Sequence, residues 1–352
     1  MAFPSPSGPN SSIWKLKDVW VANRGDNWPD ATFDRACFAG GTTSGTATNV
    51  IEFITVASAG NATDFGDLTV TRSVLSAGQA NSKTRGLFSS GYQASPGPGN
   101  INTIEFITLN TTGNATDFGD LLFSPRGAAS LSSSTRGIVA GGVGNIPSQG
   151  DGSNNVFNNI NFVTISTTGN ASDFGNLATA NAQAAGVANA TRGLFGGGYY
   201  IPGTPGDPRP SRNIVEYITI ASTGNSLDFG DLSSSKRLNQ GMGSTTRALI
   251  GSGSLNPGSN SSNVIDFFTI ASTGNATDFG DLVANYSQGG GAADNNITGV
   301  FAGGSQSPAG DVVDIQSVTI ASTGNASDFG DLTIVGHDNG GSVSSQKASG
   351  NA

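Results

Sequence analysis

The chain has 352 residues, of which 36% are hydrophobic, 12% are charged and 52 are glycine, and its formal net charge is −9. This apolar content is too high for a disordered chain, and the glycines follow no three-residue period, which excludes collagen. The negative charge opposes binding to polyanions, so we expect neither a nucleic-acid partner nor an anionic membrane surface.

The first 33 residues differ from the rest of the chain and are expected to form a separate N-terminal arm. All three tryptophans, Trp14, Trp20 and Trp28, lie there. In SSIWKLKDVW, apolar residues recur at helical spacing from Ile13 onward, which predicts a short amphipathic helical or extended arm. Because large aromatic side chains dominate interfaces, Trp14, Leu16, Trp20 and Trp28 are the candidate docking residues.

Targeting signals and reactive side chains are scarce in this sequence. The N-terminus has no basic start followed by an apolar core, so no signal peptide is expected. No apolar run reaches the roughly 18 residues that a membrane span needs. The single Cys37 excludes an intrachain disulfide and is expected to be a buried thiol, while the single His337 cannot build a histidine-based zinc cluster.

One motif, STGNATDFGDL, recurs in six near-copies along the chain. The glycines of the GN pair lie 50 to 56 residues apart, at Gly60, Gly113, Gly169, Gly224, Gly274 and Gly324. A period of this length indicates a propeller or another repeat array.

Two further elements recur in step with the motif and have the composition of strands. One is RACFAGG, which returns as RGLFSSG, RGIVAGG, RGLFGGG, RALIGSG and TGVFAGG. The other is NVIEFITV, which returns as NTIEFITL, NINFVTI, NIVEYITI, NVIDFFTI and DIQSVTI. In NVIEFITV, Ile51 and Phe53 point to one side, and Ile54 and Val56 to the other. We therefore expect strands that are covered on both faces.

These elements predict an all-β fold with four strands per repeat. We expect the Gly-Gly strand nearest the axis, then the IEFIT strand, the strand after the turn, and a fourth such as TVTRSVLSA. Four strands per ~50 residues make a β-propeller blade, so six copies predict six blades over residues 34–346, with 347–352 as a tail. The C-terminal TIVGHDNGGSVSS matches the segments after earlier turns, and we expect its strand to complete the first blade and close the ring.

The repeat resembles the kelch family over roughly residues 35–345. The shared features are an Arg-bearing segment, an apolar strand ending in Gly-Gly, a loop, an IEFIT-type strand and an aromatic residue in the last strand. Kelch repeats usually carry Trp where this chain carries Phe. The stretch IWKLKDVWVANRGDNWP and the glycine-rich repeats are also similar to structural proteins of tailed bacteriophages, particularly marine phages. This resemblance implies a virion component.

Six copies of one motif favour architecture over chemistry, because a catalytic site needs different groups around one substrate. We expect each Phe to plug the space between blades, and the Asn and first Asp to cap their turn. The alternative is a calcium ion in each turn, although the spacing differs from an EF-hand. We expect no cofactor. The turn-motif residues are Asp64, Phe65, Asp117, Phe118, Asp173, Phe174, Asp228, Phe229, Asp278, Phe279, Asp328 and Phe329.

The repeated arginines Arg85, Arg136, Arg192 and Arg247 are expected to bind acceptors in neighbouring blades. The loops after the Gly-Gly pairs differ from copy to copy and are expected on the face opposite the turns. Because function on rigid scaffolds tends to lie in variable loops, this face is the candidate recognition surface. Its candidate residues are Tyr92, Tyr199, Tyr200, Arg209 and Arg212. The alternative is that these loops are tolerated insertions.

These features together predict a non-enzymatic structural or adhesion protein of a phage virion, such as a fibre, nozzle or decoration component, made in the host cytoplasm. No catalytic residue is expected, because no credible Ser/His/Asp triad can be assembled. The expected partners are other virion proteins, bound through the arm, and a host surface glycan or protein. A glycan-acting propeller enzyme and a bacterial cell-surface lectin are the alternatives.

Overall fold

The computed structural model describes residues 34–43, 45–93, 99–144, 155–201, 210–255, 260–287, 289, 291–306, 309–334 and 340–345. The chain divides into two compact units, Met1–Phe33 and Asp34–Ala352. The predicted arm with Trp14, Leu16, Trp20 and Trp28 lies outside the described residues, as do the tail at 347–352 and Arg209.

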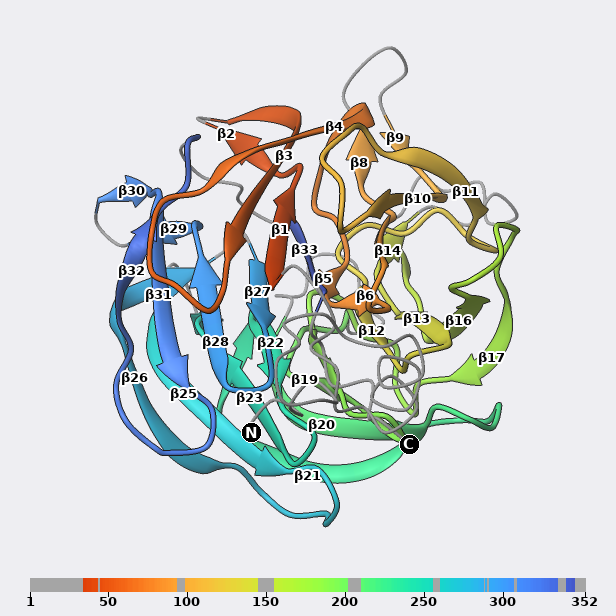
Figure 1. Cartoon of the computed structure of the whole chain (residues 1–352). Coiled ribbons are helices and arrows are strands. Elements are labelled where there is room, and N and C mark those ends of the chain that lie inside the picture. Colours follow the sequence, from red (N-terminus) through yellow and green to blue (C-terminus); the bar gives the residue numbers. More distant parts are fainter. Residues whose placement is uncertain are drawn as a thin grey trace, which may run out of the picture. The chain divides into compact units, whose positions relative to one another are not determined.

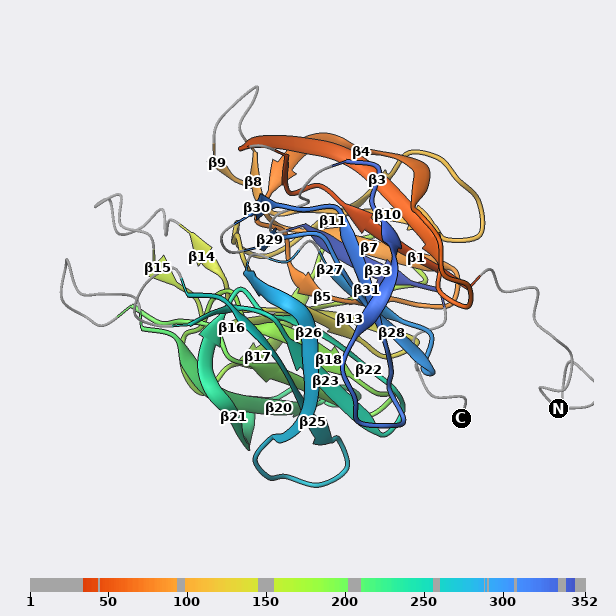
Figure 2. The same cartoon turned by 90° about the vertical axis from the view of Figure 1, so that its left-hand side faces the viewer.

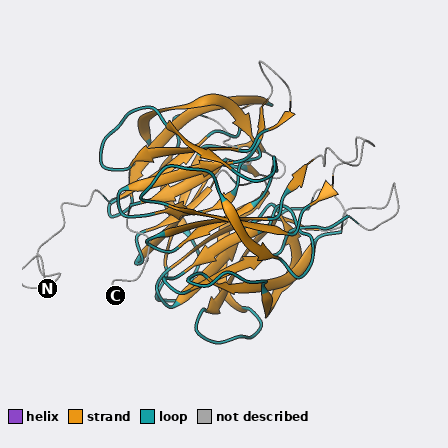
Figure 3. Ribbon diagram, turned by 90° about the vertical axis from the view of Figure 1, so that its right-hand side faces the viewer, coloured by secondary structure: helices purple, strands orange, loops and turns teal. Residues whose placement is uncertain are grey.

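The described part of the second unit consists of β-strands and loops, without a helix (Figure 3). Among these residues no helix is long and apolar enough to cross a membrane. The all-β prediction is therefore confirmed for the part of the chain that the structure describes.

The strands form a propeller-like ring of sheets, and the same antiparallel four-strand order recurs around it (Figure 1). From the axis outward, the first sheet is β33 (Gly341–Ser344), β1 (Arg35–Ala39), β3 (Thr46–Thr55) and β4 (Thr63–Ser73); the second is β6 (Ala80–Asn81), β7 (Arg85–Ser89), β10 (Thr103–Thr108) and β11 (Thr116–Asp120); the third is β12 (Ala129–Ser132), β13 (Arg136–Ala140), β16 (Asn159–Thr164) and β17 (Ser172–Asn176). The fourth is β18 (Ala185–Ala188), β19 (Arg192–Gly196), β20 (Arg212–Thr219) and β21 (Leu227–Arg237); the fifth is β22 (Gln240–Gly243), β23 (Arg247–Gly251), β25 (Ser262–Thr269) and β26 (Thr277–Ser287); the sixth is β27 (Gly291–Asp294), β28 (Thr298–Ala302), β31 (Asp314–Thr319) and β32 (Ser327–Asp331).

The hydrophobic core lies between consecutive sheets, at contacts that we call junctions. Each junction has its own cluster of buried apolar residues, including the closing junction between the sixth and first sheets. Strand β3 contributes Ile51 and Phe53 to one cluster and Ile54 to the cluster on its other face, which Val56, just after the strand, also joins. The prediction that these strands are covered on both faces is confirmed.

The C-terminal strand completes the first sheet. Strand β33 pairs antiparallel with β1, with Val343 opposite Cys37, so strands about 300 residues apart in the sequence lie side by side. The predicted closure of the ring by the C-terminal strand is confirmed, and the inner edge of the first sheet is covered.

The second sheet departs from the predicted repeat, so five blades are regular where the sequence predicts six. Its inner strand β6 has only two residues. The short strand β5 (Ala77–Gly78), which precedes β6 in the chain, pairs in parallel with β12 of the third sheet instead. Strand β5 lies among the inner strands at the centre of the ring (Figure 1). A Cβ on Gly78 would lie 2.0 Å from the carbonyl oxygen of Ser130, so only glycine allows this approach.

Two details of the predicted strand order are wrong. The Gly-Gly strand is second from the axis, and its glycines form the turn after the strand; Gly40 and Gly41, for example, have φ of 64° and 87°. The segment TVTRSVLSA is not a fourth strand of its own blade. Its first residues extend β4 to Ser73, and the chain then crosses to the axis of the next sheet.

The variable loops form short hairpins at one end of the ring. Loop β1–β3 and turn β3–β4 lie at opposite ends of β3, and the same connection recurs in each sheet, so loops and turns occupy opposite faces as predicted. Figure 2 shows β8, β9, β14 and β15 on one side. The hairpin strands are β2 (Thr42–Thr43), β8 (Tyr92–Gln93), β9 (Gly99–Asn100), β14 (Val143–Gly144), β15 (Asn155–Val156), β24 (Ser254–Leu255), β29 (Ser305–Gln306) and β30 (Gly310–Asp311).

Candidate functional site

The repeated turn motif joins each sheet to the preceding one. At the junction of the first and second sheets, the Asp67 amide donates to Asn114 Oδ1 at 3.0 Å and the Gly113 amide donates to the Phe65 carbonyl at 2.8 Å. The Ala115 amide completes the set by donating to the Asp67 carbonyl at 2.8 Å. We call these three contacts the junction bonds.

The junction bonds recur at all six junctions, including the closing one. The expectation that the motif Asn caps its own turn is wrong, because its side chain accepts a bond from the neighbouring sheet. Gly66 lies against this contact: a Cβ there would meet the Gly113 carbonyl carbon at 2.6 Å. The motif is repeated because every junction needs the same backbone contact.

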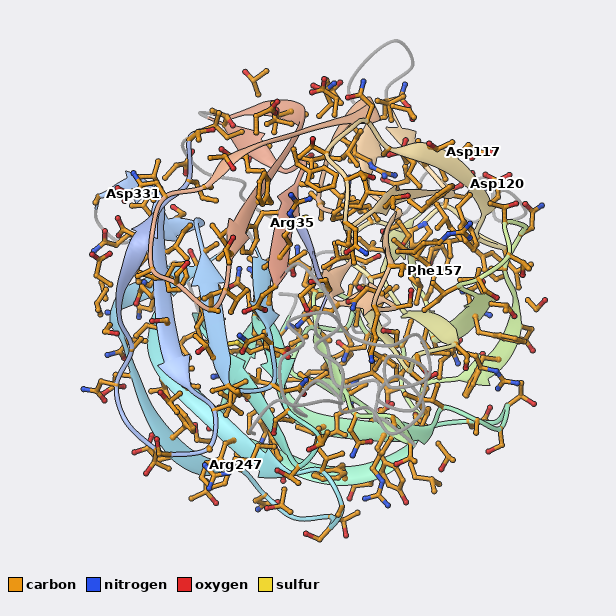
Figure 4. All side chains as sticks on the ribbon, in the orientation of Figure 1. Arg35, Asp117, Asp120, Phe157, Arg247 and Asp331 are labelled. Carbon is orange, nitrogen blue, oxygen red and sulfur yellow. The ribbon has the colours of Figure 1, made fainter. Side chains whose placement is uncertain are left out.

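The motif aspartates lie on the fourth strand from the axis of each sheet, two in every sheet except the third, where Asn176 replaces the second. Figure 4 places Asp117, Asp120 and Asp331 at the periphery. The first aspartate of each pair is exposed, and the ladder is irregular beside it. Charges and irregular pairing on an edge strand oppose pairing with another chain. Among the described residues, no group of three or more His, Cys, Asp and Glu side chains could hold a metal.

The motif phenylalanines pack in the junctions, as predicted. Phe65 is buried and meets Phe53 of its own sheet edge to face, with ring centroids 5.8 Å apart. The guanidinium of Arg35 lies 4.5 Å above the Phe53 ring and donates to the Leu109 carbonyl of the next sheet at 3.1 Å. We call this unit the arginine–aromatic pair.

The arginine–aromatic pair recurs at five junctions. Arg85, Arg136, Arg192 and Arg247 each lie over an aromatic ring and donate to a carbonyl of the following sheet, as predicted from the sequence. In the sixth sheet Thr298 stands in place of the arginine and Ser317 in place of the aromatic residue beneath it. The closing junction therefore has no such pair.

Buried acceptors on the third strands also serve the junctions. Glu105, for example, accepts the backbone amide of Thr69 from the preceding sheet and forms a 2.8 Å ion pair with Arg72. Lys236 and Asp266 form a second fully buried pair at 2.9 Å. Burial lowers the pKa of Arg72 and of Lys236, and the neighbouring carboxylates oppose this. These charges hold sheets together.

The predicted recognition residues differ widely in exposure. Tyr200 is 37% exposed, with Arg212 stacked over its ring at 5.5 Å, and Tyr92 is half-buried beneath Arg126. Tyr199 is only 2% exposed and packs against Val143 and Ala182, so its predicted place on the surface is wrong. Arg212 is 8% exposed.

Sequence reasoning missed an apolar group on the loop side. Leu122 and Phe123 are 48% and 40% exposed, and Phe123 stacks on Phe157 with centroids 5.7 Å apart. The sequence did distinguish these two residues, because LLFSP differs from the corresponding residues of the other copies. The one cysteine, Cys37, is fully buried as predicted, and burial raises the pKa of its thiol.

A small cavity lies on the axis, at the end that carries the variable loops. Its volume is about 30 Å³, and residues beside the start of every inner strand line it, including Leu75, Gly127, Gln240 and Ala292. The inner strands start beside the Gly-Gly turns, as in the pairing of Ala129 with Ala140, so the cavity belongs to the loop end. Gly78 of β5 also lines it.

Comparisons with known proteins support the fold alone. No model of a known protein family matches the chain, and no curated protein does. One solved structure, described as "Structure of YjhT", is similar with a TM-score of 0.64 and 13% sequence identity. The match covers 85% of this chain and 99% of that one. At this identity the similarity shows a shared ring of sheets.

Proposed function

We propose that this protein is a non-enzymatic structural or adhesion component of a bacteriophage virion, in which a kelch-like propeller presents variable loops to a protein or glycan. The contrast between the two ends of the ring carries the proposal. One end repeats the junction bonds six times, whereas the other carries hairpins of different length with exposed groups such as Tyr200 and Phe123. A rigid ring with diverse loops suits recognition.

We further propose that the irregular second sheet counts as a sixth blade. Its strands β7, β10 and β11 pair as in the other sheets, and buried clusters cover both of its faces. Only its inner strand deviates, because β5 fills the axis.

The virion assignment draws on the resemblance of the repeats and of the N-terminal stretch to phage structural proteins. We propose that the arm with Trp14, Leu16, Trp20 and Trp28 binds other virion proteins. Mass spectrometry of purified virions tests the location. Deletion of residues 1–30 should leave a folded ring that no longer enters the particle; a deletion that unfolds the ring would make the tryptophans part of its core.

The recognition role is tested by exchanging one hairpin. Replacing residues 200–211 by the shorter fifth-sheet loop should preserve assembly and change binding to host cells. Unchanged binding after exchange of each variable hairpin in turn would support tolerated insertions. A screen of polysaccharides separates a binder from a glycan-acting enzyme, and absence from virions would favour a bacterial cell-surface lectin.

A further inference from the structure

Arg212, at the loop end of the fourth sheet, is a largely buried cation without a paired carboxylate. It is 8% exposed, and burial lowers the pKa of its guanidinium. The buried Arg72 and Lys236 each form an ion pair, at 2.8 and 2.9 Å, whereas Arg212 forms none with the part of the chain that the structure describes. Because a guanidinium loses hydration on burial, the missing partner calls for an explanation.

The carboxylate of Glu216 does not fill this place. It opposes the lowered pKa of Arg212, as Tyr200 also does. Its Oε2, however, accepts the Ser226 hydroxyl at 2.6 Å and the Ala178 amide at 3.1 Å, and so serves the junction with the third sheet. Glu216 therefore supplies negative charge near Arg212 without bonding to it.

One edge of the Arg212 guanidinium is open. Nη1 donates to the Ala180 carbonyl at 3.5 Å, the one hydrogen bond that this side chain makes to the described residues. Nε and Nη2 make no such bond, yet neither belongs to the unbonded polar atoms that are enclosed, so both keep accessible surface. The backbone beneath is fixed, because the Arg212 amide donates to the Gly198 carbonyl at 2.8 Å. Two adjacent N–H donors on an anchored guanidinium match the two oxygens of a carboxylate.

The surface beside this edge favours an acid group that is attached to a ring. The Tyr200 ring is 37% exposed, and its centroid lies 5.5 Å from the Arg212 guanidinium. A uronic acid carries its carboxylate directly on the sugar ring, so one sugar spans both groups, and tyrosine offers a flat amphipathic contact. The net charge of −9 opposes a long polyanion, which favours a glycan with isolated acid groups.

We propose that Arg212 and Tyr200 bind a uronic acid residue of a glycan, with Arg212 Nε and Nη2 donating to its carboxylate and its ring packed against Tyr200. The proposal rests on the recognition role of the loop end and names the ligand recognised there.

The test is titration of the full-length protein with methyl glucuronide, followed by NMR. Methyl glucoside is the neutral analogue, and acetate is the carboxylate without a ring. The glucuronide should bind saturably and at least about tenfold more tightly than either, because the charge-assisted bonds and the ring contact act together.

Variants locate the binding. Arg212→Gln should weaken glucuronide binding at least about tenfold, through loss of the charge-assisted bonds. Tyr200→Ala removes an exposed side chain and should weaken glucuronide but not acetate binding, so it tests the site even where Arg212→Gln fails to fold. The matched controls are Arg126→Gln and Tyr92→Ala, in a second guanidinium–tyrosine pair of the loop end, 5.7 Å apart. Both should leave glucuronide affinity unchanged.

Three results would overturn the proposal. They are equal binding of glucuronide and glucoside, equal losses in the Arg212 and Arg126 variants, and tighter binding of a glutamate-containing tripeptide than of glucuronide. The last would assign the carboxylate to a protein partner. Each leaves the hairpin exchange to decide the recognition role independently: if the exchange still changes binding to host cells, the loop end recognises another ligand.

Discussion

The junction between the fifth and sixth sheets and the closing junction between the sixth and first are built on the same backbone plan but differ in their side chains. Both have the three junction bonds, with the backbone amides of Asp281 and Asp331 donating to Oδ1 of Asn325 and Asn61. Only the former has an arginine–aromatic pair. The backbone contacts are therefore the common requirement for a junction, and the arginine–aromatic pair adds to them.

The closing junction keeps the buried third-strand acceptor, as the fifth–sixth junction does where Gln316 accepts the Val283 amide, and it also has a bond from Asn295 to Asp34. Asn295 donates to Asp34 at 2.8 Å, and Glu52 accepts the Thr333 amide at 2.7 Å. The first sheet is also completed by β33 from the far end of the sequence. We expect this junction to depend on β33 more than on side chains.

Removing β33 should have the largest effect. A chain that ends at Leu332 lacks the partner of β1 and exposes the buried Ala36–Ala39 edge, so we expect loss of cooperative unfolding and aggregation. Size-exclusion chromatography and thermal melting measure this. A truncated protein that melts like the full-length chain would contradict closure by β33.

Phenylalanine truncation should distinguish the two junctions. Phe279→Ala should destabilise the protein by about 3–5 kcal/mol, because it leaves a cavity and removes the edge-to-face contact with Phe267. The loss of stability for Phe329→Ala should be smaller than that for Phe279→Ala by roughly 0.5–1.5 kcal/mol, since Ser317 stands where the aromatic partner would be. Denaturant unfolding measures both, and equal costs would show that the aromatic pair adds nothing.

The arginine–aromatic pair can be removed from one junction and built into the other. Arg247→Met should cost about 1–2 kcal/mol through loss of the stacked cation and its bond to the Ile320 carbonyl. The double variant Thr298→Arg with Ser317→Phe should raise stability by up to ~1 kcal/mol. If the double variant is less stable than the parent, the closing junction has no room for the pair.

The outer aspartates should matter least among the motif residues. Replacing Asp278 and Asp281 together by Asn removes two exposed or half-buried charges and should change stability by less than ~1 kcal/mol. Metal analysis of the parent and variant should give equal values. Calcium near one ion per turn, lost with these substitutions, would restore the alternative of metal-binding turns.

The sequence predicted the repeated strands and the arginine contacts between sheets, but it failed where a position depends on one particular group of another repeat. Strand composition, the two-sided apolar pattern of β3 and ring closure follow from local spacing. The role of the motif Asn was missed because its partner, the Asp67 amide for Asn114, lies in another repeat. Likewise, RSVLSAGQAN does not reveal that β5 fills the axis, since that position depends on Ser130 and Gly186 opposite Gly78. The axial cavity was missed for the same reason, because it is lined by residues from beside all six inner strands.

The smallest expected effect concerns pH at the closing junction. Burial raises the pKa of Asp34, and the bond from Asn295 opposes this shift. The folded protein therefore holds this proton more tightly than the unfolded chain, whose Asp titrates near about 3.9. Stability should fall as pH rises from that value through the raised folded pKa, and then stay level. Asp34→Asn cannot titrate and should lack this loss.

Denaturant unfolding of both proteins between pH 4 and 7, at fixed ionic strength, measures the difference. Asn295→Ala removes the bond that lowers the pKa of Asp34, so its pH-dependent loss should extend to higher pH than in the parent. The junctions with an arginine–aromatic pair supply the internal control, because Arg247→Met should lower the free energy of unfolding by the same amount at every pH. The free energies of unfolding of the parent and of Asp34→Asn could instead differ by a constant amount across this range. That result would show that Asp34 does not couple proton binding to closure.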